Sequence, residues 1–398
     1  FSSDAEMEQV FSPVHNTKPA EAFKPLNVVV LILESFGKEY TGFFNKDLDN
    51  GTYKGYTPFL DSLLAEGLTF DYSYGNGRKS IDGMPSVLSS IPMFIEPFVL
   101  TPYAVNEITG VACLLKDKGY YTAFFHGAPN NSMGFQAYAK SAGFDNYLGM
   151  NEYPDNNAFD GTWAIWDEEF LQFYADEMGK MPQPFVTSVF TASSHHPFKI
   201  PEKYDGKFPE GNLPIHKCVG YSDYALKRFF EKMSQYDWFS NTLFVITADH
   251  TNQSDHDIYK TDVGVYSVPI LFYQPGSELK GRLSLPVQQI DILPSIMSYL
   301  NYDKPYIAFG QDVFSTNVED KYVVNYNNQF YQLFDDNYFL QFDGEQTKAI
   351  YAYKEDVMLT NNLLNSFPEE KRKEMETHLK AMIQQYIVRT STDNLKIK

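Results

Sequence analysis

NVVVLILE, residues Asn27–Glu34, is the stretch that decides the fold. It is a continuous apolar run, rich in β-branched residues and too short for a helix, which is typical of a parallel strand buried on both faces. Segments with helical spacing, such as Thr57–Gly67, separate it from further runs of the same kind. These runs are Tyr120–His126, Phe185–Thr191, Leu243–Asp249 and Val268–Tyr273. The alternation predicts an α/β fold, an α/β/α sandwich with a mostly parallel central sheet.

The pattern changes after about Phe314. Residues Tyr322–Phe342 read as short antiparallel strands joined by polar turns, and a final helix is expected from about Pro368. We therefore divide the chain into an N-terminal extension (1–26), a large α/β domain (27–314) and a small C-terminal α+β subdomain (315–398).

The charge of the chain limits its partners. Its 32 basic and 51 acidic side chains give a formal net charge of -19, which opposes general attraction to nucleic acid or to an anionic bilayer. An anionic substrate would need a local positive centre, such as a metal. The two cysteines, Cys113 and Cys218, exclude a disulfide scaffold and a cysteine-rich zinc site.

Polar residues close the predicted strands. Glu34 ends the first, His126 the second, Asp249 and His250 the fourth, and His195 follows the third after a short link. Ligands gather at the carboxyl ends of parallel strands, so these residues are the first candidates for a site. A carboxylate after a strand can also be only a helix N-cap, and single histidines are usually structural. The adjacent Asp249 and His250 suit a divalent cation held by nitrogen and oxygen donors.

The segment Gly75–Pro92, GNGRKSIDGMPSVLSSIP, supplies a candidate nucleophile in Ser80. Its stretch from Met84 to Ile91 can form a helix whose N-terminal end lies near Ser80 and favours an anion there. Coordination to a divalent cation would stabilise the serine alkoxide without a separate base. Arg78 and Lys79 could add positive charge, although such residues are more often only solvated. The residues alone leave four competing serines open, namely Ser73, Ser86, Ser89 and Ser90.

Several separated segments together resemble the alkaline phosphatase superfamily, in particular its lipoteichoic acid synthase-like, or phosphoglycerol transferase, branch with the sulfatase fold. The similarity runs from about Asn27 to Phe314, which marks 27–314 as a sulfatase-like catalytic domain. The matching segments are NVVVLILESF, TPFLDSLLAEGLTFDYSY, GRKSIDGMPSVLSSIP, FFHG, TASSHHPF, TLFVITADH, VPILFYQPG and VQQIDILPSIMSYL.

The resemblance implies a metal centre. Glu34, Asp249 and His250 match the family's metal ligands, and Ser80 stands at the position of a nucleophilic threonine that also contacts the metal. The family typically binds one divalent cation there, Mn²⁺, with Zn²⁺ or Mg²⁺ as alternatives.

The resemblance also implies substrate contacts. His126 and His195 match histidines that hold the phosphate and hydroxyl groups of the substrate, whereas His196 falls where the family usually carries an aromatic residue. We keep His196 and Arg78 as further substrate-binding candidates. The synthases grip the glycerophosphate head group with a tryptophan and an arginine, and Met133 and Phe135 stand in that region here. This departure puts the lipoteichoic acid substrate in doubt.

We therefore expect a metal-dependent, phosphoglycerol transferase-like enzyme that attacks a lipid- or glycan-linked phosphodiester with Ser80. Alternatives are a phosphoethanolamine transferase, a phosphodiesterase, a sulfatase, or a catalytically silent binding or sensor domain. Ser80 lacks the C/S-x-P-x-R pattern of formylglycine sulfatases, and the intact ligand set argues against a silent domain. The family implies an extracytoplasmic location, periplasmic or at the cell surface, with a membrane anchor N-terminal to this chain. The sequence does not decide the oligomeric state.

Overall fold

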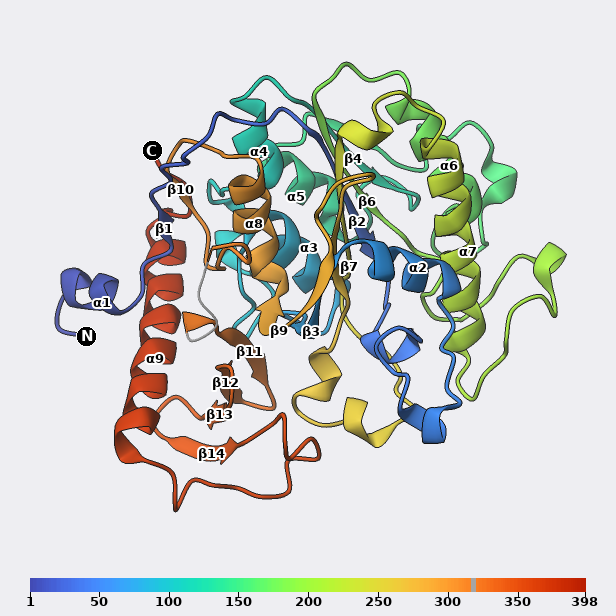
Figure 1. Cartoon of the computed structure of the whole chain (residues 1–398). Coiled ribbons are helices and arrows are strands. Elements are labelled where there is room, and N and C mark those ends of the chain that lie inside the picture. Colours follow the sequence, from blue (N-terminus) through green and yellow to red (C-terminus); the bar gives the residue numbers. More distant parts are fainter. Residues whose placement is uncertain (316–319) are drawn as a thin grey trace.

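A central sheet of eight strands organises the part of the chain that the computed structural model describes, residues 1–315 and 320–398 (Figure 1). The strand order is β5-β4-β6-β2-β7-β8-β3-β9. The strands are β2 (Asn27–Leu33), β3 (Leu68–Tyr74), β4 (Tyr121–His126), β5 (Asn146–Leu148), β6 (Phe185–Phe190), β7 (Thr242–Ala248), β8 (Ile270–Tyr273) and β9 (Gly281–Gln288).

Strand β2 lies between β6 and β7, parallel to both, and all seven of its residues are buried. Because side chains alternate along a strand, β2 feeds two hydrophobic cores, one on each face of the sheet. Its side chains at 28, 30 and 32 enter one core, and those at 29, 31 and 33 enter the other. This double burial explains why the run is apolar throughout.

Helices cover both faces (Figure 1). On one side lie α3 (Ser80–Ser89), α4 (Val111–Lys116), α5 (Phe135–Ser141) and α8 (Ile292–Tyr299). On the other lie α2 (Pro58–Glu66), α6 (Asp167–Met178) and α7 (Ile215–Met233). The expected α/β/α sandwich is therefore confirmed.

The sheet differs from the sequence prediction in the direction of one strand, β8, and in three strands that were not predicted, β3, β5 and β9. β8 runs antiparallel to both of its neighbours, β7 and β3. β3 was not predicted as a strand, because Asp71 and Tyr72 interrupt its apolar pattern where the strand is only half-buried. Outer strands of a sheet are less covered than β2, so their sequences need not be continuously apolar.

A separate antiparallel sheet follows the large domain, as expected. Its strands pair in chain order, and the last of them was not foreseen. They are β11 (Val323–Asn327), β12 (Phe330–Phe334), β13 (Phe339–Phe342) and β14 (Thr347–Tyr351). Helix α9 (Glu369–Ser391) packs beside this sheet, and Pro368 is its N-cap rather than its first helical residue. The exact domain boundaries stay a prediction.

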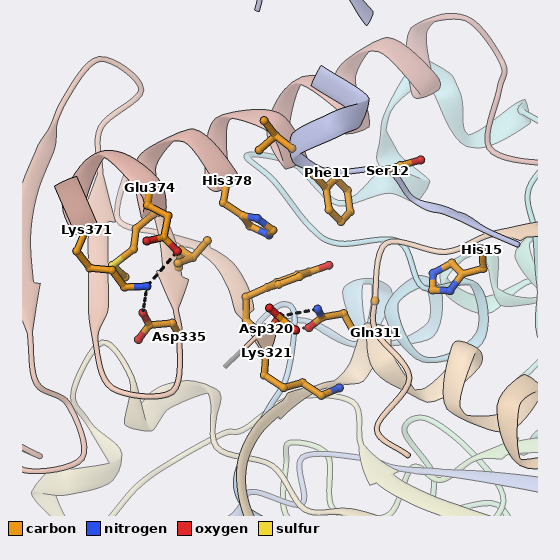
Figure 2. A pocket seen from close by; sticks show the side chains of 15 residues that line it. Phe11, Ser12, His15, Gln311, Asp320, Lys321, Asp335, Lys371, Glu374 and His378 are labelled. Atoms are coloured by element: carbon orange, nitrogen blue, oxygen red, sulfur yellow. Dashed lines mark hydrogen bonds and ion pairs between the residues drawn. The ribbon is translucent and has the colours of Figure 1, made fainter. Parts of the chain in front are cut away.

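The N-terminal stretch is tied to the rest of the fold. Helix α1 (Asp4–Val10) lies against α9, and β1 (Val14–His15) pairs with β10 (Tyr306–Ile307). A cavity of about 410 Å³ opens between this stretch, α9 and the residues just before β11, and Phe11, Lys321 and His378 are among the residues that line it (Figure 2). None of the predicted site residues lines it. Within the two described ranges, no helix combines the length and apolar character that a membrane crossing requires.

Candidate metal centre

The sheet brings the three predicted metal ligands together. Glu34 directly follows β2, and Asp249 and His250 directly follow β7, which is the neighbouring strand. One ligand atom from each lies within 4.8 Å of the other two, and all three residues are buried. Among the residues that the structure describes, this is the one group of three or more such side chains with that spacing.

The imidazole of His250 is oriented by the backbone. Its Nδ1 lies 2.5 Å from the carbonyl oxygen of Thr251, and because a carbonyl only accepts, Nδ1 carries the proton. Nε2 therefore faces the carboxylates, 3.1 Å from Asp249 Oδ2 and 3.7 Å from Glu34 Oε1. Such a fixed tautomer is usual for a histidine that ligates a metal.

Buried charge accumulates at this point. Burial and the nearby Asp249 raise the pKa of Glu34 to about 8. Burial lowers the pKa of His250, but the two carboxylates outweigh it and raise that pKa to about 10. In the described part of the chain the buried Asp249 Oδ2 has no hydrogen-bond partner, although His250 Nε2 lies 3.1 Å from it. Two carboxylates and an imidazole nitrogen that converge at this spacing fit a divalent cation.

Three hydroxyl residues that the sequence prediction missed hold Glu34 and Asp249 in place, Ser35 through their carboxylates and the other two through the backbone of Glu34. Ser35 donates from its backbone N–H to Asp249 Oδ1 (2.7 Å) and from Oγ to Glu34 Oε1 (2.7 Å). Thr191 Oγ1 accepts the backbone N–H of Glu34, and Ser194 Oγ donates to its carbonyl. Ser35 has φ +59°, a strained value for a serine that aims its N–H at Asp249. The only available signal was their position just after strand ends.

Ser80 lies at this cluster. Its Oγ is 3.2 Å from Glu34 Oε2 and 3.4 Å from His250 Nε2. The expectation of a helix beginning near Met84 needs correction, because α3 begins at Ser80 itself. Asp82, in the first turn, accepts the backbone N–H groups of Arg78 and Lys79 and so fixes this start. The hydroxyl therefore sits at the partly positive end of the helix.

The four competing serines are engaged elsewhere. Each forms a hydrogen bond with a residue outside the cluster: Ser73 with Val268, Ser86 with Ile91, Ser89 with Tyr138 and Ser90 with Ile290.

A small cavity of about 40 Å³ adjoins Glu34, and His126 and His195 both line it. His126 Nδ1 lies 2.9 Å from the carbonyl oxygen of Phe190, so the ring donates there and leaves Nε2 as an acceptor. Burial lowers the pKa of His126 to about 4, which keeps the ring neutral. His195 Nδ1 is fixed in the same way by the carbonyl of His196.

The other substrate-binding candidates lie further out. Arg78 is exposed beside Ser80, and the exposed side chain of His196 does not line the cavity. Met133 lines it, as does Trp163, which the sequence prediction missed. The Trp163 ring packs edge-on against His195 at 4.5 Å, and its Nε1 donates to the carbonyl of His196. No sequence pattern marks this tryptophan, which lies in a loop.

The sequence of this chain is similar to those of several curated bacterial proteins. Lipoteichoic acid synthase-like YvgJ of Bacillus subtilis (strain 168) is 26% identical over 315 residues, 73% of this chain and 50% of that protein. Phosphoglycerol transferase I of Citrobacter koseri (strain ATCC BAA-895 / CDC 4225-83 / SGSC4696) is 26% identical over 266 residues, 60% of this chain and 33% of that protein. The chain thus spans half or less of these curated relatives.

Solved structures share the fold over the whole chain. An alkaline phosphatase superfamily protein from Vibrio parahaemolyticus has a TM-score of 0.85 at 22% identity, covering 100% of this chain and 98% of its own. The lipoteichoic acid synthase LtaP from Listeria monocytogenes has a TM-score of 0.78 at 21% identity, covering 98% of both chains. The Sulfatase family model matches residues 26–302, which is most of the chain. The chain therefore belongs to the sulfatase family and has an alkaline phosphatase-like fold with a small C-terminal antiparallel sheet.

Proposed function

We propose that this chain is the catalytic part of a metal-dependent phosphoryl transferase of the phosphoglycerol transferase type, with Ser80 as nucleophile. The observation that carries the proposal is the position of Ser80 Oγ, 3.2 Å from Glu34 Oε2 and 3.4 Å from His250 Nε2 at the start of α3. A serine within reach of a cation's ligands and at a helix N-terminus is suited to attack a phosphorus atom and to hold the phosphoryl oxygens.

Glu34, Asp249 and His250 would hold one divalent cation, and we favour Mn²⁺, with Zn²⁺ or Mg²⁺ as alternatives. When bound, such an ion lowers the pKa of the Ser80 hydroxyl and stabilises negative charge on the transferred group. Ser35 keeps the two carboxylates in register through its hydrogen bonds to both.

The reaction has two steps. Ser80 Oγ loses its proton to solvent and attacks the phosphorus of a phosphodiester, so that an Oγ–P bond forms while the bond from phosphorus to the leaving oxygen breaks. The leaving oxygen takes its proton from solvent, and we assign His195, whose Nδ1 donates to the carbonyl of His196, to hold the leaving hydroxyl through Nε2 as a hydrogen-bond acceptor. The intermediate is a phosphodiester, because the transferred phosphorus keeps its other substituent. A second hydroxyl, or water, then attacks this phosphorus and releases its proton to solvent, the Oγ–P bond breaks, and Ser80 is regenerated.

The acceptor hydroxyl would approach His126. Because His126 is neutral and donates from Nδ1 to the carbonyl of Phe190, its Nε2 can accept a hydrogen bond from a substrate hydroxyl. Among the residues that the structure describes, no Lys or Arg lines the cavity beside Glu34, and Met133 and Trp163 form part of its wall. A glycerophospholipid head group without a second anionic charge fits such a wall better than one with it. We place the reaction outside the cytoplasm, on a lipid- or glycan-linked substrate reached through an N-terminal membrane anchor.

The covalent step can be tested directly. The chain with Mn²⁺ is incubated with phosphatidylglycerol, phosphatidylethanolamine or a generic phosphodiester, and both turnover and peptide mass are measured. We expect a peptide containing Ser80 that carries the phosphoryl group together with the donor's head group, and a loss of turnover of roughly 1000-fold or more in Ser80→Ala. Folding and most of the metal affinity should survive in this variant.

Ser62→Ala is a matched control, since Ser62 is exposed on α2 and bonds only its own helix in the described structure. It should retain full turnover. Undiminished activity in Ser80→Ala would refute the assignment. The relative turnover of the three donors distinguishes a phosphoglycerol transferase, a phosphoethanolamine transferase and a plain phosphodiesterase.

A further inference from the structure

A buried glutamine joins the metal-binding strand end to the loop that carries the nucleophile. Gln289 is the first residue of a 3₁₀ turn, η11 (Gln289–Asp291), and is fully buried. Its Nε2 donates to the carbonyl oxygens of Ala248 (2.6 Å) and Asp249 (2.9 Å), and its Oε1 accepts the backbone N–H of Asn76 (2.9 Å). One amide group thus forms hydrogen bonds both with the backbone at the end of β7 and with the backbone of the loop just before Ser80.

Two further amides extend this bridge to the C-terminal sheet. Asn76 Nδ2 donates to Gln288 Oε1 and to the carbonyl of Val324 in β11, both at 2.8 Å. Gln288 Oε1 also accepts the N–H of Val324, and its Nε2 donates to the carbonyl of Tyr322. All three amide side chains are buried, so each bond lies in a setting where an unpaired partner would be costly.

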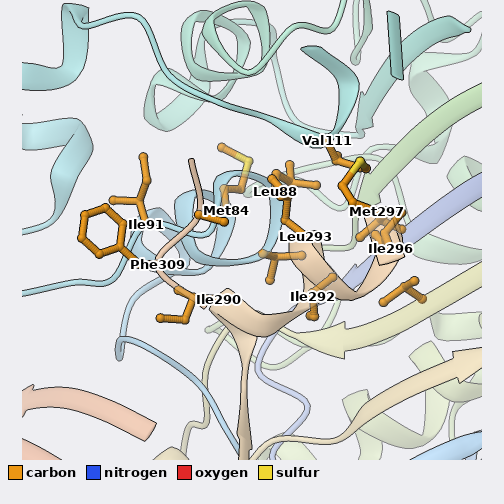
Figure 3. Close-up of a cluster of buried hydrophobic side chains, with 14 of the residues drawn as sticks. Met84, Leu88, Ile91, Val111, Ile290, Ile292, Leu293, Ile296, Met297 and Phe309 are labelled. Atoms are coloured by element: carbon orange, nitrogen blue, oxygen red, sulfur yellow. The ribbon is translucent and has the colours of Figure 1, made fainter. Parts of the chain in front are cut away.

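Close packing connects these hydrogen-bonded residues to the helix that begins at Ser80. Gly83, one turn after Ser80, lies so close to the metal ligand that a Cβ at this position would be 2.8 Å from the Cα of Asp249. Behind it, Met84 and Leu88 of α3 pack against Leu293 of α8 in an apolar layer (Figure 3). Helix α3 is held by this layer. The loop before it is held by hydrogen bonds, from Asn76 to Gln289 at its beginning and from Arg78 and Lys79 to Asp82 at its end.

From this geometry we infer that Gln289 is a positioning residue, which sets the placement of Ser80 relative to Asp249 by bonding both the β7 end and the nucleophile loop. The inference rests on the proposed function for its kinetic readout only. Its effect on the metal site can be measured without turnover. The QQID residues at 288–291, part of the segment VQQIDILPSIMSYL quoted above, thereby acquire a physical role beside the proposed metal centre.

The test compares Gln289→Met and Gln289→Asn with the wild type. Methionine keeps the approximate volume but removes all three hydrogen bonds, and asparagine keeps the amide but shortens its reach by one methylene. We expect kcat to fall by about 100-fold in Gln289→Met with KM nearly unchanged, because misplacement of a reacting group by about 1 Å costs that much. Mn²⁺ affinity, measured by calorimetry with Mn²⁺ alone, should fall as well, and Gln289→Asn should be intermediate in both.

Gln385→Met is the matched control. Gln385 is another buried glutamine, bonded to the carbonyl of Phe11 and to Arg389 far from the metal cluster. It should lose thermal stability comparably while keeping kcat and Mn²⁺ affinity. Folded Gln289→Met with wild-type kcat and wild-type Mn²⁺ affinity would overturn the inference.

If Gln289→Met does not fold, Gln289→Asn decides by the same criteria. Failure of both variants to fold would also overturn the inference, since Gln289 would then serve the fold as a whole. If the wild type transfers no phosphoryl group from any donor, the proposed function fails, and the Mn²⁺ affinities of the variants still decide the role of Gln289.

Discussion

Gly83→Ala tests how closely the nucleophile helix must approach the metal ligand. The added Cβ would lie 2.8 Å from the Cα of Asp249 and 2.9 Å from its Cβ and carbonyl oxygen. Ordinary contact begins at 3.4 Å, so the first turn of α3 or the end of β7 must move by about 0.6 Å, the difference between 3.4 and 2.8 Å. Backbone atoms cannot rotate out of the way, and the displacement therefore reaches Ser80.

Gly83→Ala should affect the free energy of folding and the reaction rate to different extents. Overpacking costs about 1–3 kcal/mol of folding free energy, and alanine regains about 1 kcal/mol over glycine in a helix. A net loss of about 0–2 kcal/mol should leave the domain folded. A 1 Å misplacement of reacting groups costs about 100-fold in rate. We therefore expect kcat to fall by about tenfold or more while the protein remains folded.

The assay is turnover of a lipid phosphodiester at saturating Mn²⁺, with circular dichroism to verify folding. Gly220→Ala is the control, because Gly220 also lies within a helix and its added Cβ would meet only the side chain of Phe208, at 3.3 Å. A side chain can yield by that amount, so turnover should be unchanged. Wild-type kcat in folded Gly83→Ala would show that the Ser80 to Asp249 spacing does not limit the reaction.

Two further predictions concern the ligands and the pocket. Asp249→Asn removes a charged ligand and should weaken Mn²⁺ binding by at least about 100-fold in calorimetry, whereas full metal occupancy in this variant would contradict the assigned ligand set. Burial lowers the pKa of His126 to about 4, below the roughly 6.5 of an unfolded chain, so the unfolded state binds more protons between these values. The unfolding free energy of the wild type should therefore fall by up to about 3 kcal/mol as pH drops from 6.5 to 4. The unfolding free energy of His126→Gln should fall by less over this range, and that of the exposed-site control His196→Gln should fall as in the wild type. An equal pH dependence in His126→Gln and the wild type would refute the burial argument.

The central fold could be predicted because burial on two faces leaves a direct record in sequence. Asn27–Leu33 is apolar throughout since its side chains alternate into two cores, and the carboxyl-end rule then placed Glu34 and Asp249 side by side on β2 and β7. The outer strand β3 left no such record, because it is half-buried at Asp71 and Tyr72. The direction of β8 also left none, since a short apolar run reads the same in either orientation.

The precise start of α3 could not be predicted, because it depends on a local exchange of hydrogen bonds. Asp82 caps the loop at Arg78 and Lys79, and Gly77 is required because a Cβ there would lie 2.2 Å from the Cβ of Asp82. The glycine therefore makes room for the cap, where the sequence suggested room for a ligand. Ser35 was missed for a related reason, since its positive φ is imposed by bonds to residues distant in sequence.

The hydrogen bonds among Asn76, Gln288 and Gln289 also connect the C-terminal sheet to the loop before Ser80. β11 supplies none of the candidate ligands and not Ser80, yet its residue Val324 accepts a hydrogen bond from Asn76 Nδ2 at the carbonyl oxygen and donates one from the backbone N–H to Gln288 Oε1. These bonds hold the same loop that Gln289 ties to the β7 end. Because buried amides in a shared network stabilise one another, loosening β11 would loosen the start of α3. The small sheet thus helps to hold the loop before Ser80, the proposed nucleophile, although it lies outside the residues that the family model matches.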